Sequence, residues 1–333
     1  MTITAVAPST LTTERVNRLR SRFQQFLAFG GLIVISIFFS FVSPNFLTFS
    51  NLTSILFSTV VIGILAVGTT FVIITSGIDL SIGTGMTLCA VMSSVFIVNW
   101  ELPTLLGVVL AILFGGLIGL INGVNIAVLK IPPFIATLAM MLVAAGLALV
   151  ISNSTPIYFP DTSGFAGISS GNLIPGLKFP NAVLILAIAA VIAALVLNKT
   201  VLGRYTFSIG SNEDATALSG INTRKWTILI YMFSGLFIGL AGVMISARLG
   251  SAQPALGSGY ELQAIAAVVI GGTSLYGGKG SILGTLIGAL IMSVLNNGLQ
   301  ITSVPQEWQN VALGIVILAA VYTDNMRRQG ASV

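Results

Sequence analysis

The chain keeps returning to uncharged, apolar runs of about 16 to 25 residues, close to the length that an α-helix needs to cross a bilayer. Only 7% of its residues are charged, 55% are hydrophobic, and the mean hydropathy is +1.03. A soluble domain has roughly a quarter of its residues charged. Because so few charges cannot cover a water-facing surface, most of the surface is expected to face lipid.

These runs predict an all-α, multi-pass membrane protein with about ten transmembrane helices. The predicted spans are 26–43, 51–75, 82–99, 104–129, 134–152, 181–198, 226–247, 260–275, 281–302 and 309–323. They form one transmembrane domain, 26–323, between tails at 1–25 and 324–333. The arginines before the first run resemble those of a signal peptide, but no small-residue cleavage site follows. We therefore interpret 26–43 as a retained span.

The positions of lysine and arginine predict the orientation, because cytoplasmic loops carry an excess of both. If the N-terminus is cytoplasmic, all of the 14 basic residues except Lys178 and Arg248 fall on the cytoplasmic side. The ten-span count then places both termini in the cytoplasm. Two halves of five spans would have opposite topology, so an inverted repeat is one interpretation. The basic residues do not form one patch, so no nucleic-acid partner is expected.

Missing residue types narrow the chemistry. The chain has no histidine and one cysteine, Cys89, which exclude Ser-His and Cys-His catalysis and His-ligated zinc. We expect no catalytic residue and no metal site. The pair Gly278-Lys279 is not a phosphate loop, because that motif needs glycine at 273 and serine or threonine at 280. The spacing of Gly284 and Gly288 is interpreted as a close helix-packing pattern.

The segment 210–222 predicts a short helix that stands apart from the spans. Ser211 or Asn212 can cap its N-terminus, and acidic residues in the first turn oppose the helix dipole. Gly220 can end it in the left-handed conformation. Such a rigid element between two spans suits the transmission of force from a soluble partner, although an ordinary loop helix is the alternative.

Other polar residues interrupt the apolar runs. Asp79 is either a polar point on a translocation route or a hinge, or else a helix cap at the cytoplasmic boundary. Amide side chains could bind sugar hydroxyls or join neighbouring helices; they are Asn122, Asn125, Asn296 and Asn297. Arg248, Glu261 and Gln263 are expected near the outer face, where they dock a binding protein or where Glu261 neutralises Arg248.

The residues also resemble a known family, in order and over roughly 43–325. The matching motifs are TSGIDLSIG at 75–83, PPFIATL at 132–138, LGRY at 202–205, RLGSAQP at 248–254, GYEL at 259–262, GGTSL at 271–275, GGKG at 277–280 and NNGL at 296–299. They resemble the permeases of ATP-binding-cassette (ABC) importers for monosaccharides such as ribose, xylose and galactose, most closely those for ribose.

The resemblance implies a type II ABC-importer-like permease in the bacterial inner membrane. It implies that the short helix is a coupling helix for a cytoplasmic ABC ATPase, through Asn212, Glu213, Asp214, Ala215, Ser219 and Gly220. It implies further partners: a periplasmic sugar-binding protein and a second permease copy or a sister permease. No cofactor is expected on this chain, because ATP and magnesium would be bound by the ATPase.

Competing functions remain open on the residues alone. An ion-coupled secondary transporter of a small polar solute commonly carries several carboxylates or histidines in mid-membrane, whereas this chain offers Asp79 at most. A membrane-embedded enzyme would need a convergent set of titratable residues. A passive channel would leave the 199–225 loop without a role.

Overall fold

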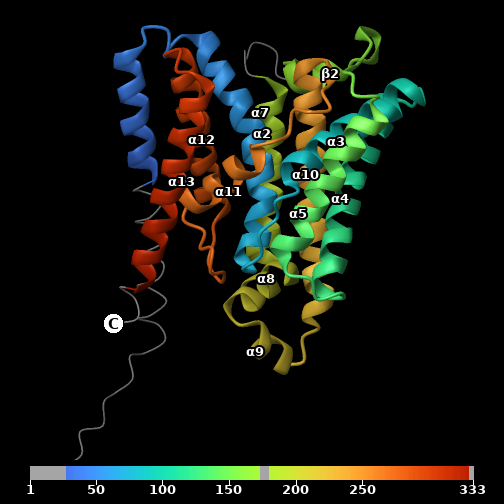
Figure 1. Cartoon of the computed structure of the whole chain (residues 1–333), viewed down its shortest axis with the longest axis vertical. Coiled ribbons are helices and arrows are strands. Elements are labelled where there is room, and N and C mark those ends of the chain that lie inside the picture. Colours follow the sequence, from blue (N-terminus) through green and yellow to red (C-terminus); the bar gives the residue numbers. More distant parts are fainter. Residues whose placement is uncertain (1–27, 173–179, 330–333) are drawn as a thin grey trace, which may run out of the picture.

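The computed structural model describes residues 28–172 and 180–329. The predicted N-terminal tail, with its arginines, and Lys178 lie outside the described residues. The described chain is a bundle of helices with one two-stranded antiparallel ladder, in which Ile157 faces Ala252 and Tyr158 faces Ser251 (Figure 1).

The helices follow the predicted apolar runs closely. After a first helix, Ala28–Val42, the elements are α2 (Phe49–Ile74), α3 (Ile82–Ser94), the π-helical η1 (Val95–Asn99), α4 (Thr104–Ala127), α5 (Pro133–Ile151), β1 (Ile157–Tyr158), η2 (Asp161–Ser163), α6 (Phe165–Ser170), α7 (Asn181–Lys199), α8 (Val201–Ser211), α9 (Glu213–Leu218), α10 (Thr223–Leu249), β2 (Ser251–Ala252), α11 (Tyr260–Ile270), α12 (Ile282–Ile301) and α13 (Gln306–Gln329).

Seven of the described helices are long and apolar enough to cross a membrane: α2, α3 continued by η1, α4, α5, α7, α10 and α12. The chain is therefore a multi-pass membrane protein. The other three predicted spans are also helices, but Ala28–Val42 and α11 are shorter, and α13 does not reach the same apolarity. The ten-span count, the cytoplasmic termini and the inverted repeat stay predictions.

The predicted span 260–275 is wrong at its end, because α11 stops at Ile270. Gly272 follows with φ +90°, a conformation that glycine adopts without steric cost, and the chain turns back there. The residues from Gly271 to Leu275 therefore belong to a turn rather than to the helix.

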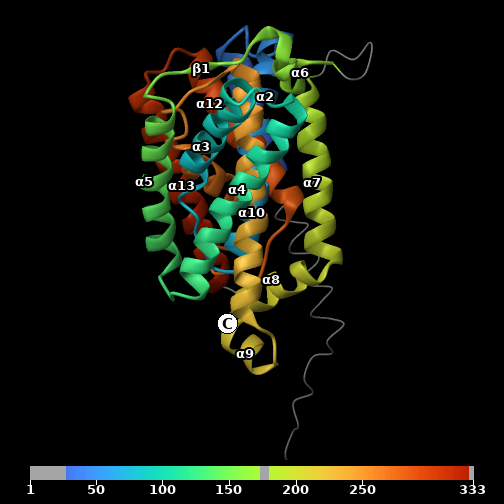
Figure 2. The same ribbon diagram turned by 90° about the vertical axis from the view of Figure 1, so that its right-hand side faces the viewer.

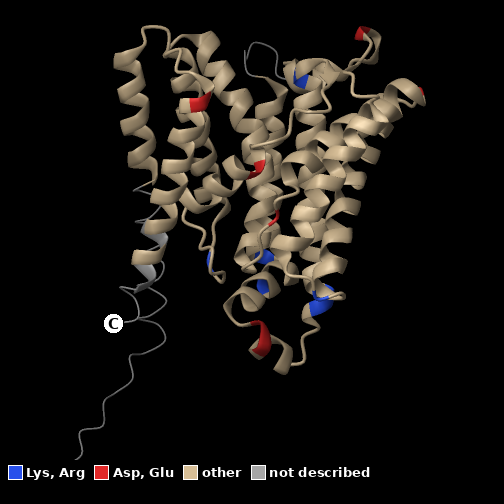
Figure 3. Cartoon of the chain, in the orientation of Figure 1, with Lys and Arg blue, Asp and Glu red and all other residues tan. Residues whose placement is uncertain are grey.

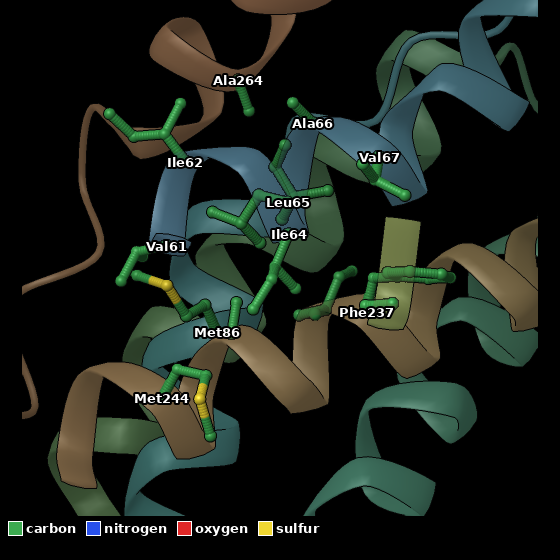
Figure 4. Close-up of a cluster of buried hydrophobic side chains, with 14 of the residues drawn as sticks. Val61, Ile62, Ile64, Leu65, Ala66, Val67, Met86, Phe237, Met244 and Ala264 are labelled. Atoms are coloured by element: carbon green, nitrogen blue, oxygen red, sulfur yellow. The ribbon is translucent and has the colours of Figure 1, made fainter. Parts of the chain in front are cut away.

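α2 forms the buried centre of the bundle. In its most apolar stretch of 18 residues 89% of the residues are buried, whereas in α5 the figure is 28%. Apolar side chains of α2 meet Met86 of α3, Phe237 and Met244 of α10, and Ala264 of α11 (Figure 4). By contrast, α4, α5 and α7 carry exposed leucine, isoleucine and valine. Because lipid tails solvate such side chains, these exposed helix faces are suited to a membrane.

The closest helix pair is α4 against α10, and its contact is made by glycines that the sequence analysis did not single out. A Cβ placed on Gly119 would collide with the Tyr231 carbonyl oxygen, and one on Gly235 with the Gly115 carbonyl oxygen. Small residues that face each other on two helices let the helix backbones touch. Gly284 and Gly288 pack in the same way against Gly271 and Ala267 of α11, which confirms their predicted packing role.

The bundle has two distinct ends, which we name the α9 end and the β1–β2 end (Figure 2). Exposed basic residues gather at the α9 end (Figure 3); they are Lys130, Lys199, Arg204, Arg224, Lys225 and Lys279. Arg248 lies at the opposite end, three residues before the ladder strand β2 begins. This polarity is what the orientation rule predicts if the α9 end is cytoplasmic.

Candidate functional site

The most exposed polar element at the α9 end is α9 itself, which projects beyond the spans (Figures 1 and 2). Asn212 Oδ1 accepts a hydrogen bond from the Ala215 N–H at 2.8 Å, so Asn212 is the N-cap. Gly220 has φ +82°. Both ends of the predicted helix are therefore confirmed. Leu218 is 90% exposed, which leaves an apolar side chain at its tip for a partner to cover.

The sequence analysis missed α8, the amphipathic helix before α9. Thr200 accepts from the Gly203 N–H at its start, and Thr206 and Ile209 are buried while Arg204 is exposed. Thr200 as a capping residue and the three-residue spacing of the buried side chains could have revealed it. The helix matters because it fixes the root of α9.

The root of α9 is attached to the core by backbone contacts. The Ile74 carbonyl at the end of α2 accepts from the Gly278 N–H at 2.9 Å, and Gly210 of α8 lies directly against the same carbonyl. Three segments that are distant in sequence thus meet at one point. The chain just before α9 is therefore held against α2 and the 271–281 turn by backbone atoms.

A second group of polar residues is buried where the chain between α2 and α3 re-enters the bundle. Asp79 Oδ1 accepts from the Ser81 N–H at 2.9 Å and from the Ser81 hydroxyl at 2.6 Å, just before α3 begins. Asn122 of α4 donates to Ser81 Oγ at 2.9 Å. Asp79, Ser81 and Asn122 are fully buried. Ser81 lies at the N-cap position of α3, but no side chain makes a capping hydrogen bond there, so the predicted cap at the cytoplasmic boundary is wrong. The contacts instead join the α2–α3 segment to α4.

Tyr231 of α10 completes this group, which we call the buried polar cluster (Asp79, Ser81, Asn122 and Tyr231). Its hydroxyl lies against Gly77, where a Cβ would collide with it. Asp79 Oδ2, Asn122 Oδ1 and Tyr231 Oη each lack a hydrogen-bond partner. Unpaired buried polar atoms cost free energy, so the cluster can gain bonds when the three segments move relative to one another.

We expect Asp79→Leu to destabilise the fold, because it removes the acceptor of the Ser81 N–H and hydroxyl at a buried site. Each donor left unpaired costs about 1–3 kcal/mol. Asp79→Asn keeps that acceptor, so it should retain the wild-type melting temperature in detergent. The exposed Asp161→Leu is the control. If asparagine destabilised the protein as much as leucine, the carboxylate charge would matter rather than the hydrogen bonds.

The remaining amides have different places. Asn296 donates to Gln263 of α11 at 2.9 Å, and Asn297 exchanges two 2.9 Å bonds with Asn51 of α2. These bonds hold α12 to its neighbours, as the interhelical interpretation predicts. Asn125 is half-buried, one turn closer to the α9 end than Asn122. A role for any of them in a translocation route stays a prediction.

The expected outer-face group is not one group. Glu261 is buried in α11, accepts from the Gly259 N–H at 3.0 Å and lies against Gly83 at the start of α3. Gln263 is turned toward Asn296, inside the bundle. Arg248 instead lies 5.0 Å over the Phe57 ring. The location predicted for Glu261 and Gln263 is therefore wrong, because α11 begins inside the bundle rather than at its edge (Figure 1).

Potential metal ligands and one thiol are present in the part of the chain that the structure describes. It holds no group of three or more His, Cys, Asp or Glu side chains arranged to ligate a metal. Cys89 is a free, buried thiol within α3. The polar residues are thus arranged as joints between helices and as one exposed helix.

Comparison with known proteins identifies what this arrangement is similar to. A sequence model of the family described as "Branched-chain amino acid transport system / permease component" matches residues 51–321. The ribose import permease RbsC of Escherichia coli (strain K12) is 46% identical over 302 residues, covering 89% of this chain and 92% of the relative.

Two further relatives extend the comparison. The ribose import permease RbsC of Bacillus subtilis (strain 168) is 43% identical over 300 residues, covering 90% of this chain and 92% of the relative. The fructose import permease FrcC of Rhizobium meliloti is 36% identical over 292 residues, covering 86% of this chain and 81% of the relative. No solved structure matches the chain.

Proposed function

The chain belongs to the permease-component family that matches its residues 51–321, and on that premise we propose that it is the membrane subunit of an ATP-driven monosaccharide importer. The observation that carries the proposal is 46% identity over nearly the whole of both chains to a ribose import permease. Ribose is the first sugar to test. The fructose import permease among the relatives favours sugars over the amino acids of the family description.

Energy would come from a separate cytoplasmic ABC ATPase, which binds ATP and magnesium. The exposed helix α9, with its side-chain cap and acidic first turn, supports this coupling role. ATP binding by the partner would press on α9. Since only residues 219–222 separate α9 from α10, the force would enter α10 at once.

The α4–α10 contact explains how such a force could travel. Because glycine backbones touch along this pair, the two helices cannot slide without separating, and they would move as one body. Tyr231 and Asn122 would then shift together against Gly77, Asp79 and Ser81. α10 has 27 residues, about 40 Å at the helical rise, and it leads directly to the β1–β2 ladder at the other end.

The other partners follow from the same orientation. The protein would sit in the bacterial inner membrane with the β1–β2 end periplasmic, where residues 153–172 and Arg248 would receive a sugar-binding protein. The exposed apolar faces of the bundle would accept a second permease copy or a sister permease as well as lipid. The translocation route would lie between the two permeases.

Reconstitution tests the function. We expect the permease, its ATPase and its binding protein in proteoliposomes to take up labelled ribose only when ATP is present. Liposomes without the ATPase should show no uptake, because the chain carries no phosphate loop. Sugar uptake by the chain alone under an ion gradient would contradict the proposal and favour a secondary transporter.

A further inference from the structure

A cavity of about 220 Å³ opens beside the root of α9, between five segments that meet at the α9 end. Its wall is formed by the 75–77 segment, the end of α4 with the α4–α5 turn, α8, α9 and the first turns of α10. It has room for about seven water molecules at ~30 Å³ each, which is the scale of a small metabolite. None of the polar contacts described above fills it.

The polar lining of the cavity has two chemically different parts. Its charged side chains are exposed and stand at the mouth, and its neutral hydroxyls lie deeper. The polar side chains are Lys130, Glu213, Arg224, Thr75, Thr227 and Tyr231. Arg224 and Tyr231 are seven residues apart on α10, so they share one helix face and lie about 10 Å apart along its axis.

The mouth favours an anionic group. Lys130 and Arg224 contribute two positive charges against the one negative charge of Glu213, so the charged side chains give the mouth a net positive charge. Arginine and lysine are the side chains that proteins use to hold phosphate. Glu213 stands at the same mouth, and a carboxylate there can accept hydrogen bonds from the hydroxyls of a bound molecule.

The floor has an unused polar atom. Tyr231 is 1% exposed, yet its hydroxyl has no hydrogen-bond partner and the side chain lines the cavity. The oxygen is almost inaccessible from the cavity, so an occupant with a hydroxyl group at its inner end would satisfy it after the Tyr231 side chain turns toward the cavity. The whole lining therefore suits a molecule that is anionic at one end and carries hydroxyls along the rest.

We infer that this cavity binds a phosphorylated monosaccharide from the cytosol, with the phosphate at Lys130 and Arg224 and the sugar hydroxyls at Glu213, Thr227 and Tyr231. The ligand would tie the first residue of α9 to α10 and to the α4–α5 turn. It would thereby hold the coupling helix in one position and slow import when phosphorylated sugar accumulates. The regulatory part rests on the proposed function, whereas the binding site does not.

Binding is tested by titrating the purified full-length chain in lipid nanodiscs with a pentose 5-phosphate, inorganic phosphate or the free pentose in a calorimeter. We expect the pentose 5-phosphate to bind best, inorganic phosphate about tenfold more weakly, and the free pentose not measurably, because it lacks the charge. Equal binding of the free pentose, or no heat from the sugar phosphate at millimolar concentration, would overturn the site.

Matched variants locate the site. The double variant Lys130→Ala, Arg224→Ala should bind the pentose 5-phosphate about tenfold or more weakly. Lys225→Ala removes the same charge from the neighbouring residue of α10, which does not line the cavity, and should bind as the wild type does. Tyr231→Phe should weaken the sugar phosphate but not inorganic phosphate, which reaches only the mouth. An equal loss in Lys225→Ala would show non-specific charge attraction and refute the assignment.

Regulation is tested with the same proteins in proteoliposomes. Pentose 5-phosphate inside the vesicles should slow ATP-driven uptake by the wild type and leave the Lys130→Ala, Arg224→Ala variant unaffected. Normal uptake with no effect of the sugar phosphate would overturn this inference and leave the proposed function standing. Absence of uptake under any condition would overturn the proposed function instead, while the calorimetric result would still decide the site.

Discussion

Gly119→Val should leave little folded permease, because it places a side chain where the backbones of α4 and α10 touch. A Cβ at residue 119 would collide with the Tyr231 carbonyl oxygen and come within 3.1 Å of the Gly235 Cα. Both are backbone atoms that cannot rotate away, so α4 and α10 would have to separate. Overpacking of a core costs about 1–3 kcal/mol even when side chains can adjust, so the cost here should reach at least the upper figure.

The measurement is the yield of monodisperse protein in detergent, together with its melting temperature. Gly146→Val is the matched control, since Gly146 also lies within an apolar helix, α5, but has no atom within 4 Å of an added Cβ. We expect the control to fold as the wild type does. Equal yields of the two variants would show that the α4–α10 contact can open, and the proposal that these helices move as one body would fail.

Glu213→Lys should uncouple transport from ATP while the permease still folds and inserts. Glu213 is exposed in the first turn of α9, where its charge stabilises the N-terminus of the helix that would contact the ATPase. Reversing a charge at the centre of an interface can cost about 2 kcal/mol or more, which weakens association tens-fold. Co-purification of the ATPase and sugar-stimulated ATP hydrolysis are the measurements.

Glu307→Lys provides the control for this change. Glu307 is also exposed in the first turn of a helix, α13, so the effect of the substitution on the helix dipole is comparable. It does not lie on α9, and we expect it to leave ATPase association intact. Normal sugar-stimulated hydrolysis in Glu213→Lys would refute the coupling role of α9.

Gly220→Pro should also uncouple transport from ATP, because proline cannot adopt the backbone conformation of Gly220. Proline fixes φ near −65°, whereas Gly220 has φ +82° and donates its N–H to the Ala217 carbonyl at 3.0 Å. The substitution would change the direction in which the chain leaves α9 for α10. Unimpaired transport would show that the angle between these two helices does not matter.

Several elements could be predicted because their causes are local. The capped helix α9 needs only Asn212, an acidic first turn and Gly220, all within nine residues of one another. The helix lies at one end of the bundle because it is a polar segment that connects two apolar spans. The Asn296 and Asn297 bonds agree with one of the two roles predicted for them, but their partners, Gln263 and Asn51, could not be predicted because they lie on other helices.

The largest error concerned α11. Hydropathy shows that the run from residue 260 is apolar, but not whether lipid or protein surrounds it. The structure surrounds it with α2, α12 and α3, so Glu261 and Gln263 are turned inward. The same limit hid the cavity beside α9, since Lys130 lies in the α4–α5 turn and Arg224 in α10, and they line one cavity only after folding.

The sequence by itself determined the solvent of this protein, the places of its helices and the presence of one exposed capped helix, because apolar length and capping depend on neighbours in the chain. Only the tertiary structure decided that α4 and α10 touch through glycines and that Asp79, Asn122 and Tyr231 share one buried cluster. Such contacts depend on which helix faces which. That choice results from packing among many helices in lipid, where every apolar face has an acceptable alternative partner in the lipid tails.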